Sequence, residues 1–201
     1  MTTFAQHFPP SEFQAASDRP LGRGELDYAA LLSHRLELMR HAFGDRPLVI
    51  TSYVRTAAET DTGNPSQHRD GSAVDVRRPD WMSWGELVLR VQALQHAGLT
   101  WGQFIIYPYE TPRQHFHISL PTGAARQQLT VKTGPQSYVP FSQQLAQGFP
   151  GEPVVRPDVT VVGGAPAPAA GGSGRGNAAL VAVAGGVAAA AALGALRGSN
   201  T

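Results

Sequence analysis

The first strong pattern along the chain is helical and runs from Glu25 to Phe43. Apolar residues recur there at the three- and four-residue spacing of one helix face, and Gly44 follows as a C-terminal stop. These residues are Tyr28, Leu32, Leu36, Met39 and Phe43. A second helix, ending at Gly98, is predicted because Ser83 and Glu86 have the spacing of a capping box.

Four shorter segments have the β-branched and aromatic composition of strands. They are residues 48–55, 73–77, 103–107 and 114–120. Helices and strands in this order, joined by short connections, predict an α+β domain in which an antiparallel or mixed sheet is flanked by helices.

Composition divides the chain into four regions. We assign them as an N-terminal extension, a folded domain, a Pro/Gly/Ala-rich linker and an apolar segment, at 1–23, 24–147, 148–177 and 178–196. The last region contains only Ala, Val, Leu and Gly, and as a helix it would reach roughly 28 Å, close to the ~30 Å hydrocarbon core of a bilayer. We predict one C-terminal transmembrane helix; a disordered Ala/Gly tail or a buried helix is the alternative.

Charge and cysteine content exclude several classes of partner and chemistry. The formal net charge is +1 and the chain has no Lys/Arg-rich run, so no nucleic-acid partner is expected. The absence of cysteine excludes thiol nucleophiles, disulfides and Cys-based zinc sites, so any metal must be held by histidine and carboxylate. The N-terminus lacks the basic start and apolar run of a secretory signal peptide.

Two polar segments carry the candidate chemistry. Because side chains alternate along a strand, His115 and His117 share a face of their predicted strand. Gly71 lies between His68 and Asp75 and allows a tight reversal that brings these two side chains toward one point. Two imidazoles and one carboxylate suffice for a catalytic zinc site whose fourth position holds water. The remaining histidines have no such context, and we interpret them as structural.

These segments resemble the D-Ala-D-Ala metallopeptidases, which include VanY-type carboxypeptidases and phage endolysins that cut L-Ala-D-Glu links. The resemblance rests on the motif Ser66-x-His68-x-x-Gly71-x-Ala73-x-Asp75, followed by His115-x-His117 and preceded by Ser52-x-x-Arg55. It covers about residues 48–120. The resemblance implies a small antiparallel sheet and one zinc ion (Zn2+) held by His68, Asp75 and His117.

The same resemblance assigns roles to residues around the metal. Arg55 would bind a carboxylate or carbonyl of the substrate, which suits a planar guanidinium, or else form a surface salt bridge. Ser66 would hydrogen-bond near the metal, or serve only as a turn former. Many members have a carboxylate as general base three residues before the last ligand, but this chain has Gln114 there. The base would then be His115, Glu110 or both together, or the domain would bind without catalysis.

The motifs together predict a zinc-dependent peptidase that cuts peptidoglycan peptides and is attached to a membrane by its C-terminal helix. A cutter of the cell wall without an export signal suggests a bacteriophage protein, used in lysis or carried in a virion that penetrates the host envelope. The protein would then lie in a virion membrane or the host cell envelope. Two alternatives remain: an inactive peptidoglycan-binding or virion structural protein, and a cellular D,D-carboxypeptidase.

Overall fold

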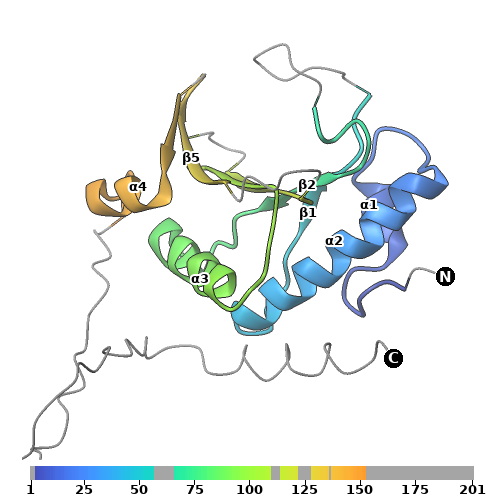
Figure 1. Ribbon diagram of the computed structural model, residues 1–201, viewed down its shortest axis with the longest axis horizontal. Coiled ribbons are helices and arrows are strands. Elements are labelled where there is room, and N and C mark those ends of the chain that lie inside the picture. The colour runs from blue at the N-terminus through green and yellow to red at the C-terminus, as the bar shows by residue number, and fades with distance from the viewer. Residues whose placement is uncertain (1–2, 57–65, 110–113, 122–127, 136, 153–201) are drawn as a thin grey trace, which may run out of the picture. The chain divides into compact units, whose positions relative to one another are not determined.

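The described residues of the computed structural model form four helices and six strands (Figure 1). The described residues are 3–56, 66–109, 114–121, 128–135 and 137–152, all within one compact unit, Met1–Val155. In chain order the elements are α1 (Pro10–Ala15), α2 (Arg23–Ala42), β1 (Ile50–Ser52), β2 (Ala73–Arg77), α3 (Trp84–His96), β3 (Gln103–Tyr107), β4 (His115–Ser119), β5 (Gln128–Gly134), β6 (Ser137–Pro140) and α4 (Phe141–Gln147).

The strands form one mixed sheet in the order β1-β2-β4-β3-β5-β6. The predicted α+β class is confirmed. A mixed sheet is one of the two forms that the sequence patterns predict. The small antiparallel sheet that the resemblance implies needs a correction, because β3 and β5 are parallel while the other four neighbouring pairs are antiparallel. β4 already occupies one edge of β3, so the chain crosses to the other edge, and β5 runs there in the same direction as β3. The sequence patterns assigned no strand after residue 120 and so missed this crossover.

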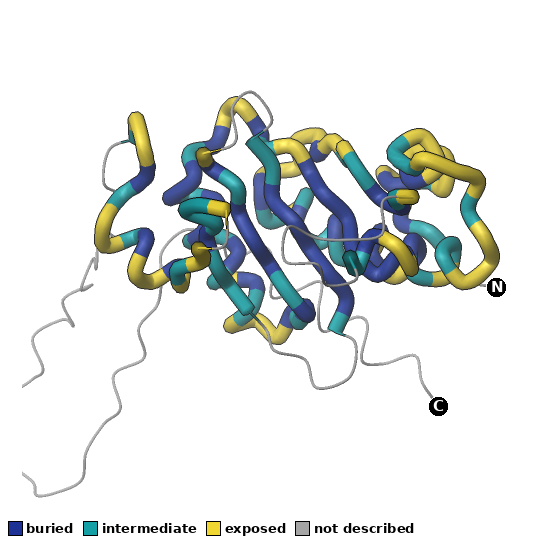
Figure 2. Tube along the Cα trace, turned by 90° about the horizontal axis from the view of Figure 1, so that it is seen from above, coloured by how far each residue is buried: buried dark blue, intermediate teal, exposed yellow. Residues whose placement is uncertain are grey.

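The two faces of the sheet differ in chemistry. Phe104 pairs with Ile118, and Ile106 with Phe116, and all four side chains are fully buried on one face. Helices α2 and α3 lie along the same side of the sheet in Figure 1, and the buried residues concentrate in the central strands in Figure 2. The other face carries Ile105, Tyr107, His115 and His117, and we call it the histidine face.

Both predicted helices are present. Helix α2 begins at Arg23, and the Oγ atom of Ser83 caps α3 by accepting a 3.1 Å hydrogen bond from the backbone N–H of Glu86. The strand predicted over 48–55 is shorter, because only Ile50–Ser52 belongs to the sheet. The next residue, Tyr53, donates its N–H to the carbonyl oxygen of Ala16 at 2.8 Å, so its backbone bonds to the N-terminal segment instead.

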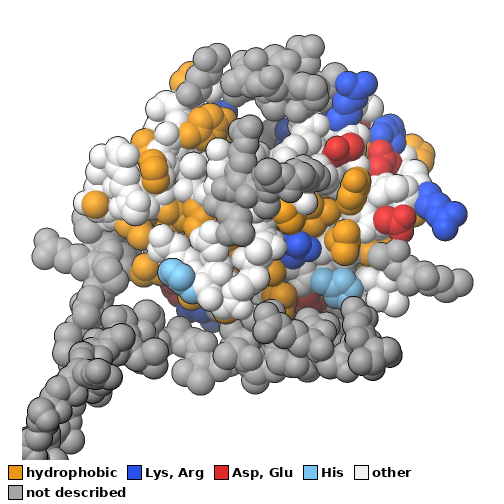
Figure 3. Space-filling model, in the orientation of Figure 1, with side chains coloured by type: hydrophobic (Ala, Val, Ile, Leu, Met, Phe, Trp, Pro, Cys, Tyr) orange, Lys and Arg blue, Asp and Glu red, His pale blue; other side chains and the backbone are white. Residues whose placement is uncertain are grey.

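The N-terminal residues belong to the folded unit. Phe8 and Phe13 are buried, and Phe13 meets Tyr53 edge to face with ring centroids 5.0 Å apart. Arg19 and Glu25 form an ion pair at the start of α2, and acidic and basic side chains intermingle near α1 in Figure 3. The region assigned as an extension, 1–23, is therefore, in its described part, an integral layer of the domain.

The folded unit also extends beyond Gln147. Phe149 is buried, and the carboxylate of Glu152 accepts hydrogen bonds from the backbone N–H of Trp84 at 2.9 and 2.8 Å. No helix among the described residues is both long enough and apolar enough to cross a membrane. The predicted linker beyond residue 152 and the predicted transmembrane helix, 178–196, lie outside the described residues.

Candidate metal centre

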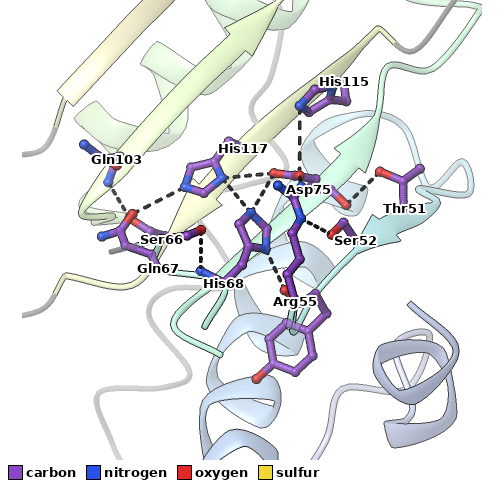
Figure 4. A network of polar contacts seen from close by, with 12 residues as sticks. Thr51, Ser52, Arg55, Ser66, Gln67, His68, Asp75, Gln103, His115 and His117 are labelled. Atoms are coloured by element: carbon purple, nitrogen blue, oxygen red, sulfur yellow. Dashed lines mark hydrogen bonds and ion pairs between the residues drawn. The ribbon is translucent and has the colours of Figure 1, made fainter. Parts of the chain in front are cut away.

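Strand pairing and one tight turn bring His68, Asp75 and His117 together. Asp75 on β2 lies directly opposite His117 on β4 in the antiparallel register. His68 lies in the turn before β2, where Gly71 adopts a φ of +78°, a conformation that favours glycine. This turn folds His68 back over the strand pair, so the three side chains converge as the sequence predicts (Figure 4).

Three potential ligand atoms lie close enough to share one ion. The Nε2 atom of His68 is 3.1 Å from Oδ1 of Asp75 and 3.2 Å from Nδ1 of His117, and that Nδ1 is 2.9 Å from the same Oδ1. All three residues are buried. Tetrahedral zinc with bonds of about 2.0–2.1 Å separates its ligand atoms by about 3.3 Å, so the cluster nearly has the dimensions of a zinc site.

Hydrogen bonds at the outward-facing ring nitrogens determine which nitrogen of each histidine carries the proton. Nδ1 of His68 donates to the backbone carbonyl oxygen of Tyr53 at 2.6 Å, and Nε2 of His117 donates to Oε1 of Gln67 at 3.4 Å. In the neutral rings the inward nitrogens then carry lone pairs. Two lone-pair nitrogens and a carboxylate oxygen cannot hydrogen-bond to one another, whereas a cation stabilises all three. The donor set therefore fits a metal ion.

The charge states of the cluster also suit metal binding. Burial alone would raise the pKa of Asp75, but His117 and His68, which donate hydrogen bonds to its carboxylate when they are protonated, bring that pKa well below its usual value. Burial lowers the pKa of His117, although the carboxylate of Asp75 acts in the opposite direction. At neutral pH the cluster thus contains a carboxylate and a neutral imidazole, which are the forms that bind metal.

The second carboxylate oxygen of Asp75 faces two cationic or titratable side chains. Arg55 donates from its guanidinium to Oδ2 of Asp75, and its Nε donates to Oγ of Ser52 at 2.7 Å. Nε2 of His115 is 4.0 Å from the same Oδ2. The Arg55 side chain is 40% exposed, so it reaches from the buried carboxylate to the surface. Arg55 and His115 therefore both lie beside the metal cluster, where the sequence places them.

His115 and Gln114, the two described residues that bear on proton transfer, have different surroundings. The ring of His115 stacks on Tyr107, with centroids 4.3 Å apart and an interplanar angle of 12°. The amide of Gln114 donates to the carbonyl oxygen of Pro108 at 2.9 Å, so it ties together the ends of the segment between β3 and β4. Glu110, the other predicted acid–base residue, lies outside the described residues.

Ser66 has a local structural contact. Its Oγ accepts the backbone N–H of His68 at 3.3 Å, and its carbonyl oxygen accepts the N–H of Arg69 at 3.0 Å. These contacts match its interpretation as a turn former that shapes the turn holding His68.

Sequence reasoning missed the outer partners of both histidines. Gln67 stands beside a predicted ligand, and that position was the one signal available for it. The carbonyl of Tyr53 is a backbone atom, and its role depends on the path of the chain after β1 rather than on any side chain. Tyr53 is further held by a 2.5 Å hydrogen bond from its hydroxyl to the carbonyl oxygen of Glu25.

The fold and the site define an α+β protein with a buried cluster of two histidines and one aspartate that could hold a metal ion. A scan against protein-family models finds no match for this sequence, and a search of curated proteins also finds none. The resemblance to the D-Ala-D-Ala metallopeptidases therefore rests on the sequence motifs alone.

Proposed function

We propose that the chain is a zinc-dependent peptidase that cleaves peptide bonds of peptidoglycan. The observation that carries the proposal is the convergence of two lone-pair nitrogens and one carboxylate oxygen in a buried site. His68, Asp75 and His117 supply three ligands, and a catalytic zinc site needs three protein ligands and one open position. The motif resemblance favours this function over other uses of the same ligand set.

Zinc is the metal that we propose. Imidazole ligands suit zinc, copper, iron and nickel better than magnesium or calcium. Two histidines and one carboxylate also bind Fe(II) in some oxygenases, but peptide hydrolysis requires no redox step. Zinc bound at this site would lower the pKa of a water molecule to about 7 and polarise a carbonyl oxygen.

Two side chains of the chain itself would complete the reaction. We assign proton transfer to His115, because its Nε2 lies beside Asp75 and its ring is oriented by the stack on Tyr107. It would accept a proton from the attacking water and deliver it to the departing nitrogen of the peptide. Arg55 would bind a carboxylate or carbonyl of the substrate through the exposed part of its guanidinium.

Binding without catalysis is the second candidate function, and Gln114 favours it. An amide cannot accept the proton of an attacking water molecule, and its NH2 group is bonded to the Pro108 carbonyl. On this alternative the domain would keep the metal and recognise peptidoglycan as an inactive binding or virion structural protein.

The cellular setting is part of the proposal. The composition of residues 178–196 supports attachment to a membrane, and a wall-cutting domain on such an anchor suits a phage protein for lysis or for penetration of the host envelope. A cellular D,D-carboxypeptidase would share the chemistry but would release only the terminal D-alanine.

Digestion of purified peptidoglycan by the full-length protein tests the proposal. The protein is stripped with a chelator, reloaded with Zn²⁺ or Fe²⁺, and the released fragments are identified by mass spectrometry. We expect cleavage with zinc, none after chelation, and none for His68→Ala. Release of terminal D-alanine alone would identify a carboxypeptidase. A folded, zinc-loaded protein that binds but does not cut several wall types would establish the binding function instead.

A further inference from the structure

A row of side chains leads away from the candidate metal centre along the histidine face. Tyr107 on β3 lies opposite His115 on β4. Ile106 pairs with Val131 in the parallel register of β3 and β5, and both point into the core. The residues that follow them, Tyr107 and Lys132, therefore point to the histidine face.

Ring contacts connect Lys132 to His115 through Tyr107. The rings of His115 and Tyr107 are stacked, and Nζ of Lys132 lies 5.2 Å from the centroid of the Tyr107 ring. An ammonium group over an aromatic face is attracted by the ring quadrupole, so Tyr107 helps to fix the position of this charge. Lys132 therefore places a positive charge about 10 Å from His115, or two strand spacings of about 4.8 Å.

The sheet order places a second cation, Arg55, on the other side of the candidate metal centre. Arg55 follows β1, whereas Lys132 belongs to β5, and the strands that carry the metal ligands lie between them. A peptide lying across the strands would meet a cation on each side of the bond that is cut. An extended peptide advances about 3.3 Å per residue, so about 10 Å corresponds to about three residues.

We propose that Lys132 determines specificity by binding a carboxylate of the substrate on the β5 side of the cleaved bond, about three residues from His115. The inference rests on the proposed peptidase function and narrows its substrate class to acidic peptides. Stem peptides of peptidoglycan fit this class, because D-glutamate linked through its side chain keeps a free α-carboxylate. The three N–H donors of the ammonium suit a charge-assisted hydrogen bond to such a group.

The test compares matched peptides and matched variants of the full-length zinc-loaded protein. The peptides are synthetic stem peptides that differ only in whether the α-carboxylate of D-glutamate is free or amidated. The variants are Lys132→Met, Lys132→Arg and the control Arg46→Met. Arg46 also lies over an aromatic ring, 4.9 Å from that of Trp81, but precedes β1 and is outside the row. Both kcat/KM and the calorimetric Kd are measured.

We expect amidation to lower kcat/KM of the wild type by about 10- to 100-fold, the range for a hydrogen bond to a charged group. Lys132→Met should lose the same factor on the acidic peptide and almost nothing on the amide, Lys132→Arg should recover most of the loss, and Arg46→Met should behave as wild type. Equal losses on both peptides, or no loss, would overturn the proposal.

The binding measurement separates this inference from the proposed function. A wild-type protein that cleaves neither peptide would contradict the peptidase function but would still report on Lys132 through its Kd. A preference for the acidic peptide that disappears in Lys132→Met would support the role of Lys132 in a binding protein. The absence of any preference, or of any binding, would overturn it.

Discussion

Replacing Gly71 by alanine should destabilise the domain through two separable effects. Gly71 has a φ of +78°, and a Cβ atom there would lie 2.7 Å from the Tyr53 hydroxyl oxygen. The backbone conformation costs an alanine about 1 kcal/mol. The clash moves the Tyr53 hydroxyl away from its buried bond to the Glu25 carbonyl, at about 1–3 kcal/mol. We therefore expect a total loss of about 2–4 kcal/mol in the free energy of unfolding.

Gly98→Ala is the matched control, since Gly98 has a φ of +97° and a Cβ there would meet nothing within 4 Å. It should cost only the conformational part, about 1 kcal/mol. Urea unfolding of both metal-free variants, analysed by linear extrapolation, measures the difference. Equal losses for the two variants would refute the reasoning, because they would show that Tyr53 yields to the new methyl group at no cost.

Three further predictions concern the centre and the end of the domain. Gln67→Leu should raise the Kd for zinc about 10-fold, as measured by competition with a chelating dye, while Gln67→Glu keeps the acceptor and should stay near wild type. Acid should destabilise the metal-free protein. Folding lowers the pKa values of Asp75 and His117 from 3.8 and 6.5, so as the pH falls the unfolded chain binds protons before the folded protein does. The stability present at pH 7 is therefore lost progressively below pH 6.5. Urea midpoints that do not change between pH 7.5 and about 5 would contradict this expectation. Glu152→Ala removes the acceptor at the first residue of α3, Trp84, and should cost about 1 kcal/mol of unfolding free energy, whereas Glu152→Gln should cost less.

Helices α2 and α3 and the candidate site residues were predictable because each depends on local spacing. Ser83 caps α3 as the capping-box spacing predicts, and the alternation along β4 separates His115 and His117 from the buried Phe116. The spacing of His68 from Asp75, with glycine between them, likewise indicates a reversal. These features follow from one or two turns of chain, which a sequence displays directly.

The features that escaped prediction depend on contacts between distant segments. The parallel pairing of β3 with β5 depends on which edge of the sheet remained open after β4 had paired. The early end of β1 depends on Ala16, which accepts the N–H of Tyr53 from a segment 37 positions away in the sequence. The packing of Phe8 and Phe13 into the core likewise depends on contacts with distant segments. The periodicity within one segment does not determine such contacts between distant segments.

The two outer partners of the metal ligands respond differently to mutation. His68 is held by a main-chain oxygen at position 53, and every amino acid at that position presents the same oxygen. His117 is held by the side chain of Gln67, which a single codon change can remove. Substitutions at codon 67 can therefore change the orientation of His117 one step at a time, whereas the position of His68 changes only when the path of the backbone changes. The hydrogen bond that orients His117 can thus change by point mutation, whereas the one that orients His68 is kept as long as the fold is kept.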